Sequence, residues 1–339
     1  MIAITEKLEK GALDELNFHF APQVVLFTAL KLGIFQAIAG GAKGADDLAS
    51  ATGCSPRGVR MLLNHMTAMG LLEKEDGMYG LNDFSRDYFL PSSGNYLGSL
   101  FVYSDQLLKL WLKLPEAVRT GRPPLSLFPD EERERLNLNI VEALFQVHKA
   151  SAWELAGLFK KELSFSGRKM KILDVAAGSA VWSLPFALQR ERVEVTAVDF
   201  VRVLEVARKF AQEFGVEDQY RFIGADIRKM DFGTEEYDLA LLGHICHSEG
   251  VEWSQRLIGK CFRALRKNGR LLIMDYIPDE GRKSAQMPLL LALNALLGTE
   301  EGDTFTFSEY RQWLLASGFT EVRTLLVDGV SPVIMAIKE

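Results

Sequence analysis

Acidic and small residues follow the ends of three predicted strands in the second half of the sequence. The first strand ends at Asp174 and leads into a loop of small residues, 176–180, with Gly178 at its centre. A strand, a small-residue loop and a helix in this order let a ligand approach bare backbone. The second strand ends at Asp199, whose carboxylate can accept hydrogen bonds from a ribose diol, and the third leads to Asp226. The sequence therefore predicts a ligand site at the ends of these strands.

Two histidines follow the fourth predicted strand, in the segment Gly243-His244-Ile245-Cys246-His247. A neutral imidazole with a pKa near 6.5 can take the proton of a hydroxyl as its oxygen attacks an electrophile. His247 and His244 are rival candidates for this general base, and a purely structural role is the alternative for each. We predict no metal site, because the two histidines lack a third ligand nearby in the sequence.

The elements that would position these residues alternate between strand and helix. This alternation predicts an α/β domain with a parallel, doubly wound sheet. A final hairpin implies one antiparallel edge strand on the mostly parallel sheet. The predicted strands are 171–175, 193–198, 220–223, 237–242, 270–276, 321–327 and 333–337, and the helices between them are 184–190, 202–214, 253–265 and 308–317.

The first half of the sequence is predicted to be mainly helical. A helix ending at Gly53, a second opening with Ser55-Pro56 and a hairpin around Asp76-Gly77 follow in the order of a winged helix. The segment 22–38 is apolar on nearly all sides, which indicates burial or a subunit interface. We expect a winged-helix domain over 1–95, a helical linker over 96–165 and the α/β domain over 166–339.

Composition and charge exclude several classes of protein. The 339 residues are 48% hydrophobic and 25% charged, which is typical of a globular chain. We expect no membrane span and no secretory signal, and the scattered cysteines Cys54, Cys246 and Cys261 suggest reduced thiols in a cytoplasm. The net charge of −6 and an acidic wing, Glu73-Lys74-Glu75-Asp76, disfavour nucleic-acid binding, although Arg57 and Arg60 lie on the second helix.

With these motifs in this order, residues 171–339 resemble a class I S-adenosylmethionine-dependent methyltransferase with a Rossmann-like sheet. The whole chain resembles the small-molecule O-methyltransferase family, which includes plant phenylpropanoid enzymes and bacterial enzymes of polyketide, carotenoid and bacteriochlorophyll pathways. The resemblance implies S-adenosylmethionine as cofactor and S-adenosylhomocysteine as product. It also implies a role in secondary metabolism and a homodimer formed through the N-terminal domain.

The resemblance also assigns roles to individual residues. Asp199 would bind the ribose hydroxyls, and His247, in an Ile-Cys-His motif, would be the general base, oriented by Asp275. The sequence departs from the family pattern in two places: Ala176 and Ala180 replace the outer glycines of the first loop, and Ser248-Glu249 replaces Asp-Trp after the histidine. The implied cofactor contacts are Asp174, Ala176, Gly178, Asp199, Phe200, Asp226, Ile227, Gly243 and His244.

Contacts with the methyl acceptor are expected on two helices and on the N-terminal domain of a dimer partner. His148 is the strongest candidate, because it places a polar group on an otherwise apolar helix face. Each candidate could instead be plain core. The candidates are Phe145, His148 and Trp153 before the sheet, and Met287, Leu291 and Asn294 after the fifth strand.

These observations together predict methyl transfer to a hydroxyl of an aromatic or polyketide-like small molecule. One alternative is methylation of carbon, nitrogen or sulfur, in which His247 only shapes the pocket, because methyl transfer depends largely on positioning the nucleophile. The other is a regulator without turnover that keeps a vestigial cofactor site.

Overall fold

The computed structural model describes residues 17–102, 104–124, 130–159, 169–189, 193–327, 329 and 331–339. The N-terminal segment, for which no secretory signal was predicted, and the expected boundary at 165 lie outside these residues. The chain forms two compact units, Met1–Lys109 and Leu110–Glu339. In the described part of the chain, none of the helices combines the length and apolar character that a membrane crossing requires.

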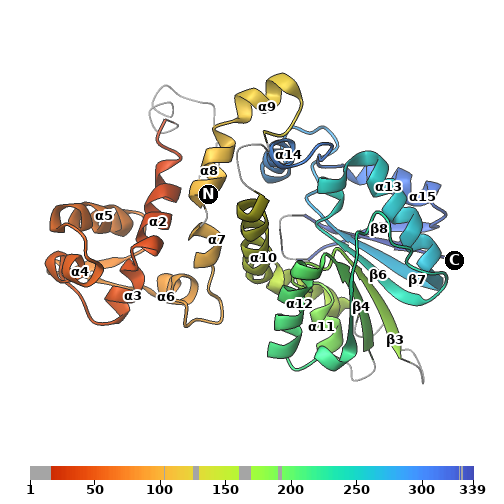
Figure 1. The fold of residues 1–339 in the computed structure, drawn as a ribbon, viewed down its shortest axis with the longest axis horizontal. Coiled ribbons are helices and arrows are strands. Elements are labelled where there is room, and N and C mark those ends of the chain that lie inside the picture. The colour runs from red at the N-terminus through yellow and green to blue at the C-terminus, as the bar shows by residue number, and fades with distance from the viewer. Residues whose placement is uncertain are drawn as a thin grey trace. The chain divides into compact units, whose positions relative to one another are not determined.

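The N-terminal unit is built from short helices and one hairpin (Figure 1). Ser55 caps the second helix of the predicted helix–turn–helix by accepting a hydrogen bond from the Gly58 amide at 3.1 Å, and Pro56 occupies its first turn. A hairpin follows, as the sequence predicted. The elements are α2 (Ala21–Lys31), α3 (Ile34–Ala39), α4 (Ala45–Thr52), α5 (Pro56–Ala68), β1 (Glu73–Glu75), β2 (Met78–Gly80), α6 (Asp83–Phe89) and α7 (Gly98–Val102).

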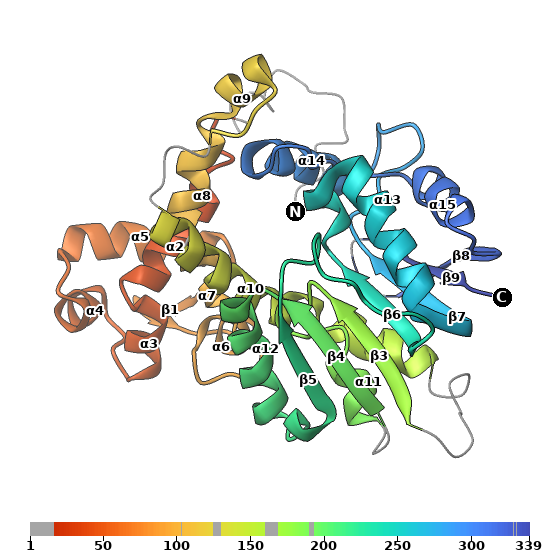
Figure 2. The ribbon, with the colours of Figure 1, turned by 45° about the vertical axis from the view of Figure 1, so that its right-hand side comes forward.

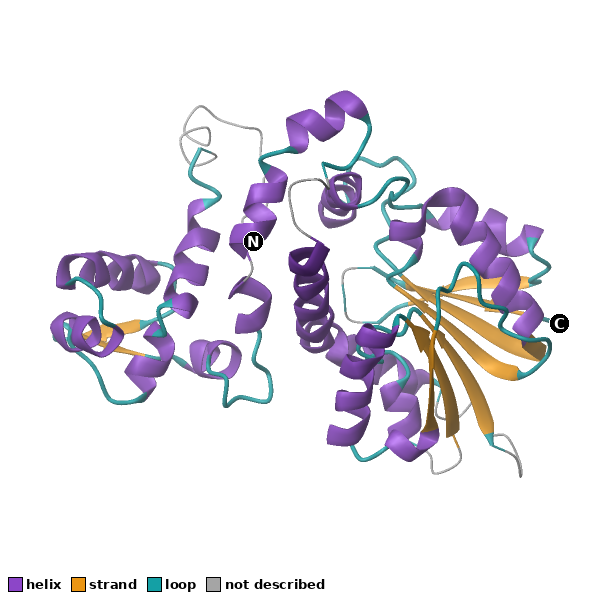
Figure 3. Cartoon of the chain, in the orientation of Figure 1, coloured by secondary structure: helices purple, strands orange, loops and turns teal. Residues whose placement is uncertain are grey.

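Helix α8 (Ser104–Trp111) leads into the C-terminal unit, which contains the fan of strands in Figure 3. Its strands are β3 (Met170–Val175), β4 (Val193–Asp199), β5 (Tyr220–Gly224), β6 (Tyr237–Gly243), β7 (Leu265–Met274), β8 (Glu321–Leu325) and β9 (Val333–Ile337). Its helices are α9 (Leu114–Thr120), α10 (Asp130–Leu158), α11 (Leu184–Leu188), α12 (Val201–Glu213), the 3₁₀ turn η2 (Glu217–Gln219), α13 (Cys246–Ala264), α14 (Gln286–Gly298) and α15 (Phe307–Ala316).

The sheet has the strand order β5-β4-β3-β6-β7-β9-β8. Strands β3 to β7 pair in parallel, and β9 pairs antiparallel with both β7 and β8. The predicted α/β class and the single antiparallel strand are confirmed. That strand lies one position in from the edge, because the final hairpin inserts β9 against β7 and leaves β8 outside.

Two apolar cores lie on opposite faces of the sheet. Alternate residues of β3 contribute to them: Ile172 packs with α10, α11 and α12, whereas Leu173 and Val175 pack with α13 and α15. Figure 2 shows the same division of helices between the faces. Because β3, β4, β5 and β6 run in parallel, their carboxyl ends meet at one edge, where Val175 pairs with Val198 and Leu242, and Asp199 with Gly224.

Candidate active site

The loop after β3 is a strained turn of small residues. Ala176, Gly178 and Ala180 have φ angles of 55°, 56° and 58°, in the left-handed region. A residue with a Cβ pays roughly 1–2 kcal/mol for this conformation, so glycine would suit each position better. Ala176 and Ala180, which depart from the family motif, therefore keep the backbone conformation that glycines would adopt. Each adds one methyl group to the loop.

Asp199 ties the end of β4 to this loop. Its Oδ2 accepts a hydrogen bond from the Gly178 amide at 2.9 Å, and its Oδ1 accepts one from the Phe200 amide at 2.7 Å. Burial raises the pKa of Asp199, and the two amide donors oppose that shift. The carboxylate is thus held in place beside the bare backbone of the loop, with acceptor capacity left for a ligand.

Asp174 lies at the base of the same loop and is 2% exposed. Its Oδ2 is buried without a hydrogen-bond partner. Burial raises the pKa of Asp174 to about 7, a hydrogen bond from Ser183 opposes the shift, and the charge of Asp199 adds to it. A buried carboxyl with an unused oxygen suits a cationic group of a ligand.

The remaining predicted cofactor residues lie around the same edge. Phe200 is 62% exposed and Ile227 is 8% exposed, so one offers an open apolar face and the other a buried one. Asp226 is bonded locally, through the Arg228 amide at 2.9 Å. Gly243 lets Trp182 pack on the end of β6, because a Cβ there would stand 2.5 Å from the indole Cδ1. Nothing in the sequence pointed to Trp182 beyond its place after the small-residue loop.

His247 and Asp275 form a hydrogen-bonded pair at the start of α13 and the end of β7. Nδ1 of His247 lies 2.7 Å from Oδ1 of Asp275. Burial opposes a charge on the imidazole, but the charge and hydrogen bond of Asp275 outweigh it and raise the pKa of His247. An ionised carboxylate only accepts hydrogen bonds, so Nδ1 carries the proton and Nε2 keeps its lone pair.

Asp275 is held by four donors in all. Besides the imidazole, the amides of His247 and Tyr276 donate to it at 3.0 and 2.9 Å, and the hydroxyl of Tyr310 donates at 2.9 Å. Burial alone would raise the pKa of Asp275, but the charge and hydrogen bond of His247, the nearby His244 and the Tyr276 amide lower it to about 2. Tyr310 comes from α15 and is fully buried. The sequence analysis missed it, because only the packing of α15 brings it to β7.

His244 is placed differently from His247. Its Nδ1 is 3.9 Å from Oδ1 of Asp275, too long for a hydrogen bond, and neither of its ring nitrogens has a partner. Its ring stacks on His148 of α10, with centroids 4.1 Å apart and planes 25° apart. Burial lowers the pKa of both rings, to about 4 for His148 and well below the usual value for His244.

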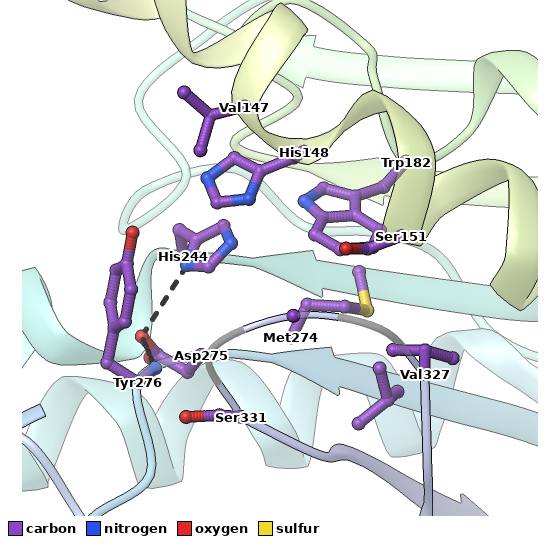
Figure 4. A pocket seen from close by; sticks show the side chains of 12 residues that line it. Val147, His148, Ser151, Trp182, His244, Met274, Asp275, Tyr276, Val327 and Ser331 are labelled. Atoms are coloured by element: carbon purple, nitrogen blue, oxygen red, sulfur yellow. Dashed lines mark hydrogen bonds and ion pairs between the residues drawn. The ribbon is translucent and has the colours of Figure 1, made fainter. Parts of the chain in front are cut away.

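A cavity of about 70 Å³ lies beside these rings (Figure 4). His148 comes from α10, Trp182 from the segment before α11, and His244, Asp275 and Tyr276 from the ends of β6 and β7. The full lining is Val147, His148, Ser151, Trp182, His244, Met274, Asp275, Tyr276, Val327, Gly329, Ser331 and Val333.

Of the predicted acceptor contacts, the structure brings His148 to this cavity. Phe145 stacks on Phe210 in the core, with ring centroids 3.8 Å apart and a 1% exposed side chain. Trp153 packs against Phe145 and Phe214, with ring centroids 6.3 Å and 5.7 Å away, respectively. Met287, Leu291 and Asn294 lie half-buried on α14 and are not part of the lining that the described residues form.

The fold also brings Asp275 close to both histidines, so a third potential metal ligand exists that the sequence spacing did not reveal. One ligand atom from each of His244, His247 and Asp275 lies within 4.8 Å of the others. In this arrangement Nδ1 of His247 and Oδ1 of Asp275 share a proton at hydrogen-bond distance. The absence of a metal ion from this site stays a prediction.

Comparisons with known proteins show what the chain is similar to. A family model described as an O-methyltransferase dimerisation domain matches residues 15–91, and one described as an O-methyltransferase domain matches residues 130–320. The chain is 30% identical over 335 residues to the tetracenomycin polyketide synthesis 8-O-methyl transferase TcmO of Streptomyces glaucescens, with 94% of each chain covered. It is 28% identical over 321 residues to the 3-hydroxy-5-methyl-1-naphthoate 3-O-methyltransferase of Streptomyces sahachiroi, with 92% of this chain and 91% of the relative covered.

The fold is shared with human N-acetylserotonin methyltransferase, whose crystal structure is a complex with S-adenosylmethionine. The TM-score is 0.84 at 24% identity, and 99% of each chain is covered. The catalytic-domain match covers more than half of this chain, and the similarity to TcmO extends over nearly all of it. The chain therefore belongs to the O-methyltransferase family, as an S-adenosylmethionine-dependent O-methyltransferase with an N-terminal dimerisation domain.

Proposed function

We propose that this O-methyltransferase methylates a hydroxyl group of an aromatic or polyketide-like small molecule, with His247 as the general base. The observation that carries the proposal is the 2.7 Å hydrogen bond between Nδ1 of His247 and the buried, ionised Asp275. This bond assigns the proton to Nδ1 and leaves Nε2 free to accept the proton of the acceptor hydroxyl.

The residues at the strand ends fit S-adenosylmethionine. The unused oxygen of Asp174 suits the ammonium of the methionine end, and a Cβ at Gly178 would meet Cγ1 of Val141 at an ordinary contact distance of 3.7 Å. Asp199 would hold the ribose hydroxyls, and Phe200 and Ile227 would flank the nucleoside. The cofactor supplies an electrophilic methyl group on a positively charged sulfur.

Asp275 would act by holding the base. Four donors fix its carboxylate, so the imidazole of His247 is kept in one orientation and one tautomer. The raised pKa of His247 makes it a stronger base than a free imidazole. Correct placement of the hydroxyl supplies a further part of the rate, because it removes the entropy cost of bringing the reactants together.

The identity of the acceptor is supported by the names of the two Streptomyces relatives, which act in tetracenomycin synthesis and on a naphthoate. The aromatic lining of the cavity, from Trp182 and Tyr276, also suits a flat ring. His148 is proposed as an acceptor contact here. Contacts from Phe145, Met287, Leu291 and Asn294 stay predictions.

A substitution of His247 tests the proposal. We expect His247→Ala to lower kcat about 10²–10⁴-fold, the usual contribution of a general base. S-adenosylhomocysteine affinity, measured by calorimetry, should not change. Asp199→Ala should instead weaken S-adenosylhomocysteine binding at least about tenfold, because it removes the carboxylate that orders the loop.

The two variants separate the possible failures. Near-normal turnover by His247→Ala, measured with a panel of naphthols and hydroxylated aromatic acids, would show that the histidine only shapes the pocket. Unchanged S-adenosylhomocysteine affinity in Asp199→Ala would contradict the placement of the nucleoside at β4.

A further inference from the structure

The stacked rings of His148 and His244, here called the imidazole pair, take no part in the proton transfer proposed above. His148 is 9% exposed, and its Nε2 has no hydrogen-bond partner. Both ring nitrogens of His244 are also buried and unpartnered. Buried polar atoms are almost always hydrogen-bonded, and the described residues offer no partner to these three nitrogens, which lie beside one cavity.

The backbone at His244 is also unusual. Its φ angle is 55°, in a region that residues with a Cβ occupy only where the surroundings impose it. The His244 amide donates to the Met274 carbonyl at 2.7 Å, which anchors this conformation to the neighbouring strand. The side chain is thereby directed at the cavity edge, next to Asp275 and 6.4 Å from the His247 ring centre.

We propose that the imidazole pair recognises a second, uncharged oxygen of the acceptor, a hydroxyl or a ketone carbonyl adjacent to the hydroxyl that is methylated. This inference rests on the proposed function. It names the class of substrate that the site selects: aromatic rings with two neighbouring oxygen substituents.

The pair suits an uncharged oxygen because both rings are neutral. A proton on one ring would repel a proton on the other across 4.1 Å, and burial penalises each charge. A neutral imidazole offers one donor and one acceptor, the two functions that hydroxyl and carbonyl oxygens need. A carboxylate would bring an uncompensated charge into the cavity, since Asp275 is already ionised there.

The position of the pair relative to the base sets the distance between the two oxygens. The ring centre of His244 lies 4.1 Å from that of His148 and 6.4 Å from that of His247. An acceptor hydroxyl at His247 therefore places the neighbouring ring position next to His244. Trp182 and Tyr276 flank His244 with ring centres 5.7 Å and 4.9 Å away and enclose the same ring system.

Three naphthalene probes test the inference on the full-length protein saturated with S-adenosylhomocysteine. The probes are 2,3-dihydroxynaphthalene, 2-naphthol and 3-hydroxy-2-naphthoate, and calorimetry measures their affinities. We expect the dihydroxy compound to bind about tenfold more tightly than 2-naphthol, the effect of satisfying one buried polar group. The carboxylate should bind no more tightly than 2-naphthol.

Variants of His148 assign the effect to the pair. His148→Phe should reduce the affinity ratio of the first two probes to about one, and His148→Gln should restore part of the ratio. His65→Phe, on the outer face of α5, is the matched control and should keep the full ratio. Retained S-adenosylhomocysteine affinity confirms that each variant is folded.

The inference is overturned if wild type binds the two naphthols equally, or binds neither. It is also overturned if wild type prefers the carboxylate, or if the preference for two oxygens survives in His148→Phe. Failure of the proposed function looks different: S-adenosylhomocysteine itself would not bind, or His247→Ala would turn over normally.

Discussion

At the scale of single residues, the hydroxyl of Tyr310 helps to decide how firmly Asp275 holds His247. It donates to Oδ2 at 2.9 Å, on the opposite side of the carboxylate from the imidazole, and comes from a different helix. The tyrosine hydroxyl donates its hydrogen bond to Asp275 and not to either histidine. It is a positioning residue that acts through the carboxylate.

We expect Tyr310→Phe to move the acid limb of the kcat/KM pH profile to higher pH by a few tenths of a unit to about one unit. Catalysis needs neutral His247, so the rate rises as pH increases through the pKa of that residue, which already lies above its usual value. Losing one donor concentrates charge on Asp275 and raises the pKa of His247 further. Asp275→Asn should move the limb the other way, because the charge that raises this pKa is gone.

Tyr79→Phe is the matched control for the loss of a buried tyrosine hydroxyl. Tyr79 is 3% exposed and donates to Oδ1 of Asn64 at 2.8 Å in the N-terminal unit. Both tyrosine variants should lose about 1–3 kcal/mol of stability in denaturant unfolding. If the pH profile of Tyr310→Phe coincides with that of Tyr79→Phe, then Tyr310 has only a structural role.

At the scale of elements, a kink in α13 separates the turn that carries His247 from the main helix. Gly250 has a φ of 75° and a ψ of −178°, and a Cβ there would stand 2.6 Å from the Glu301 carbonyl oxygen. The same chain segment reaches back to the turn, where the Asp303 amide donates to the His247 carbonyl at 2.9 Å. The kink thus lets the loop after α14 support the base.

We expect Gly250→Ala to lower the free energy of unfolding by about 1–3 kcal/mol and kcat by more than about tenfold, because both φ and the collision force the His247 turn to shift. Gly259→Ala, in the regular part of α13, meets nothing within 4 Å. It should be neutral or stabilising by up to about 1 kcal/mol. Thermal melts and steady-state kinetics compare the two variants. Equal stability and equal kcat would show that the kink does not support His247.

At the scale of the whole molecule, we propose a homodimer formed through the N-terminal unit. The match to a dimerisation-domain model over residues 15–91 supports it. Phe18 and Phe20, just before α2, are 64% and 56% exposed, and α2 buries Leu26, Ala29 and Leu30 while its other apolar residues stay partly accessible. Exposed aromatic side chains next to such a helix are typical of an interface.

Sedimentation should give a mass of two 37.9 kDa chains for wild type. The double variant Phe18→Ser and Phe20→Ser should shift the protein toward the single-chain mass, because it removes apolar area from the interface. Leu112→Ser, 78% exposed in the C-terminal unit, is the control and should stay dimeric. A monomeric wild type, or a dimer that both sets of substitutions leave intact, would contradict this interface.

The sequence by itself determined the order of the strands along the chain and the carboxyl ends of the first four, which are β3, β4, β5 and β6. Alternation of apolar strands and amphipathic helices is a local pattern, and parallel strands necessarily bring Asp174, Asp199 and Gly243 to one edge. The resemblance to the family added the pairing of His247 with Asp275, which the structure places 2.7 Å apart.

Only the tertiary structure decided which side chains complete the site. Phe145 and His148 lie on the same helix, yet one stacks in the core on Phe210 and the other lines the cavity. Tyr310 reaches Asp275 from 35 positions further along the chain, and Ala176 takes a glycine-like φ that its residue type disfavours. Such contacts depend on how helices rotate and pack against the sheet, and local sequence patterns carry little information about packing between segments that are distant in the chain.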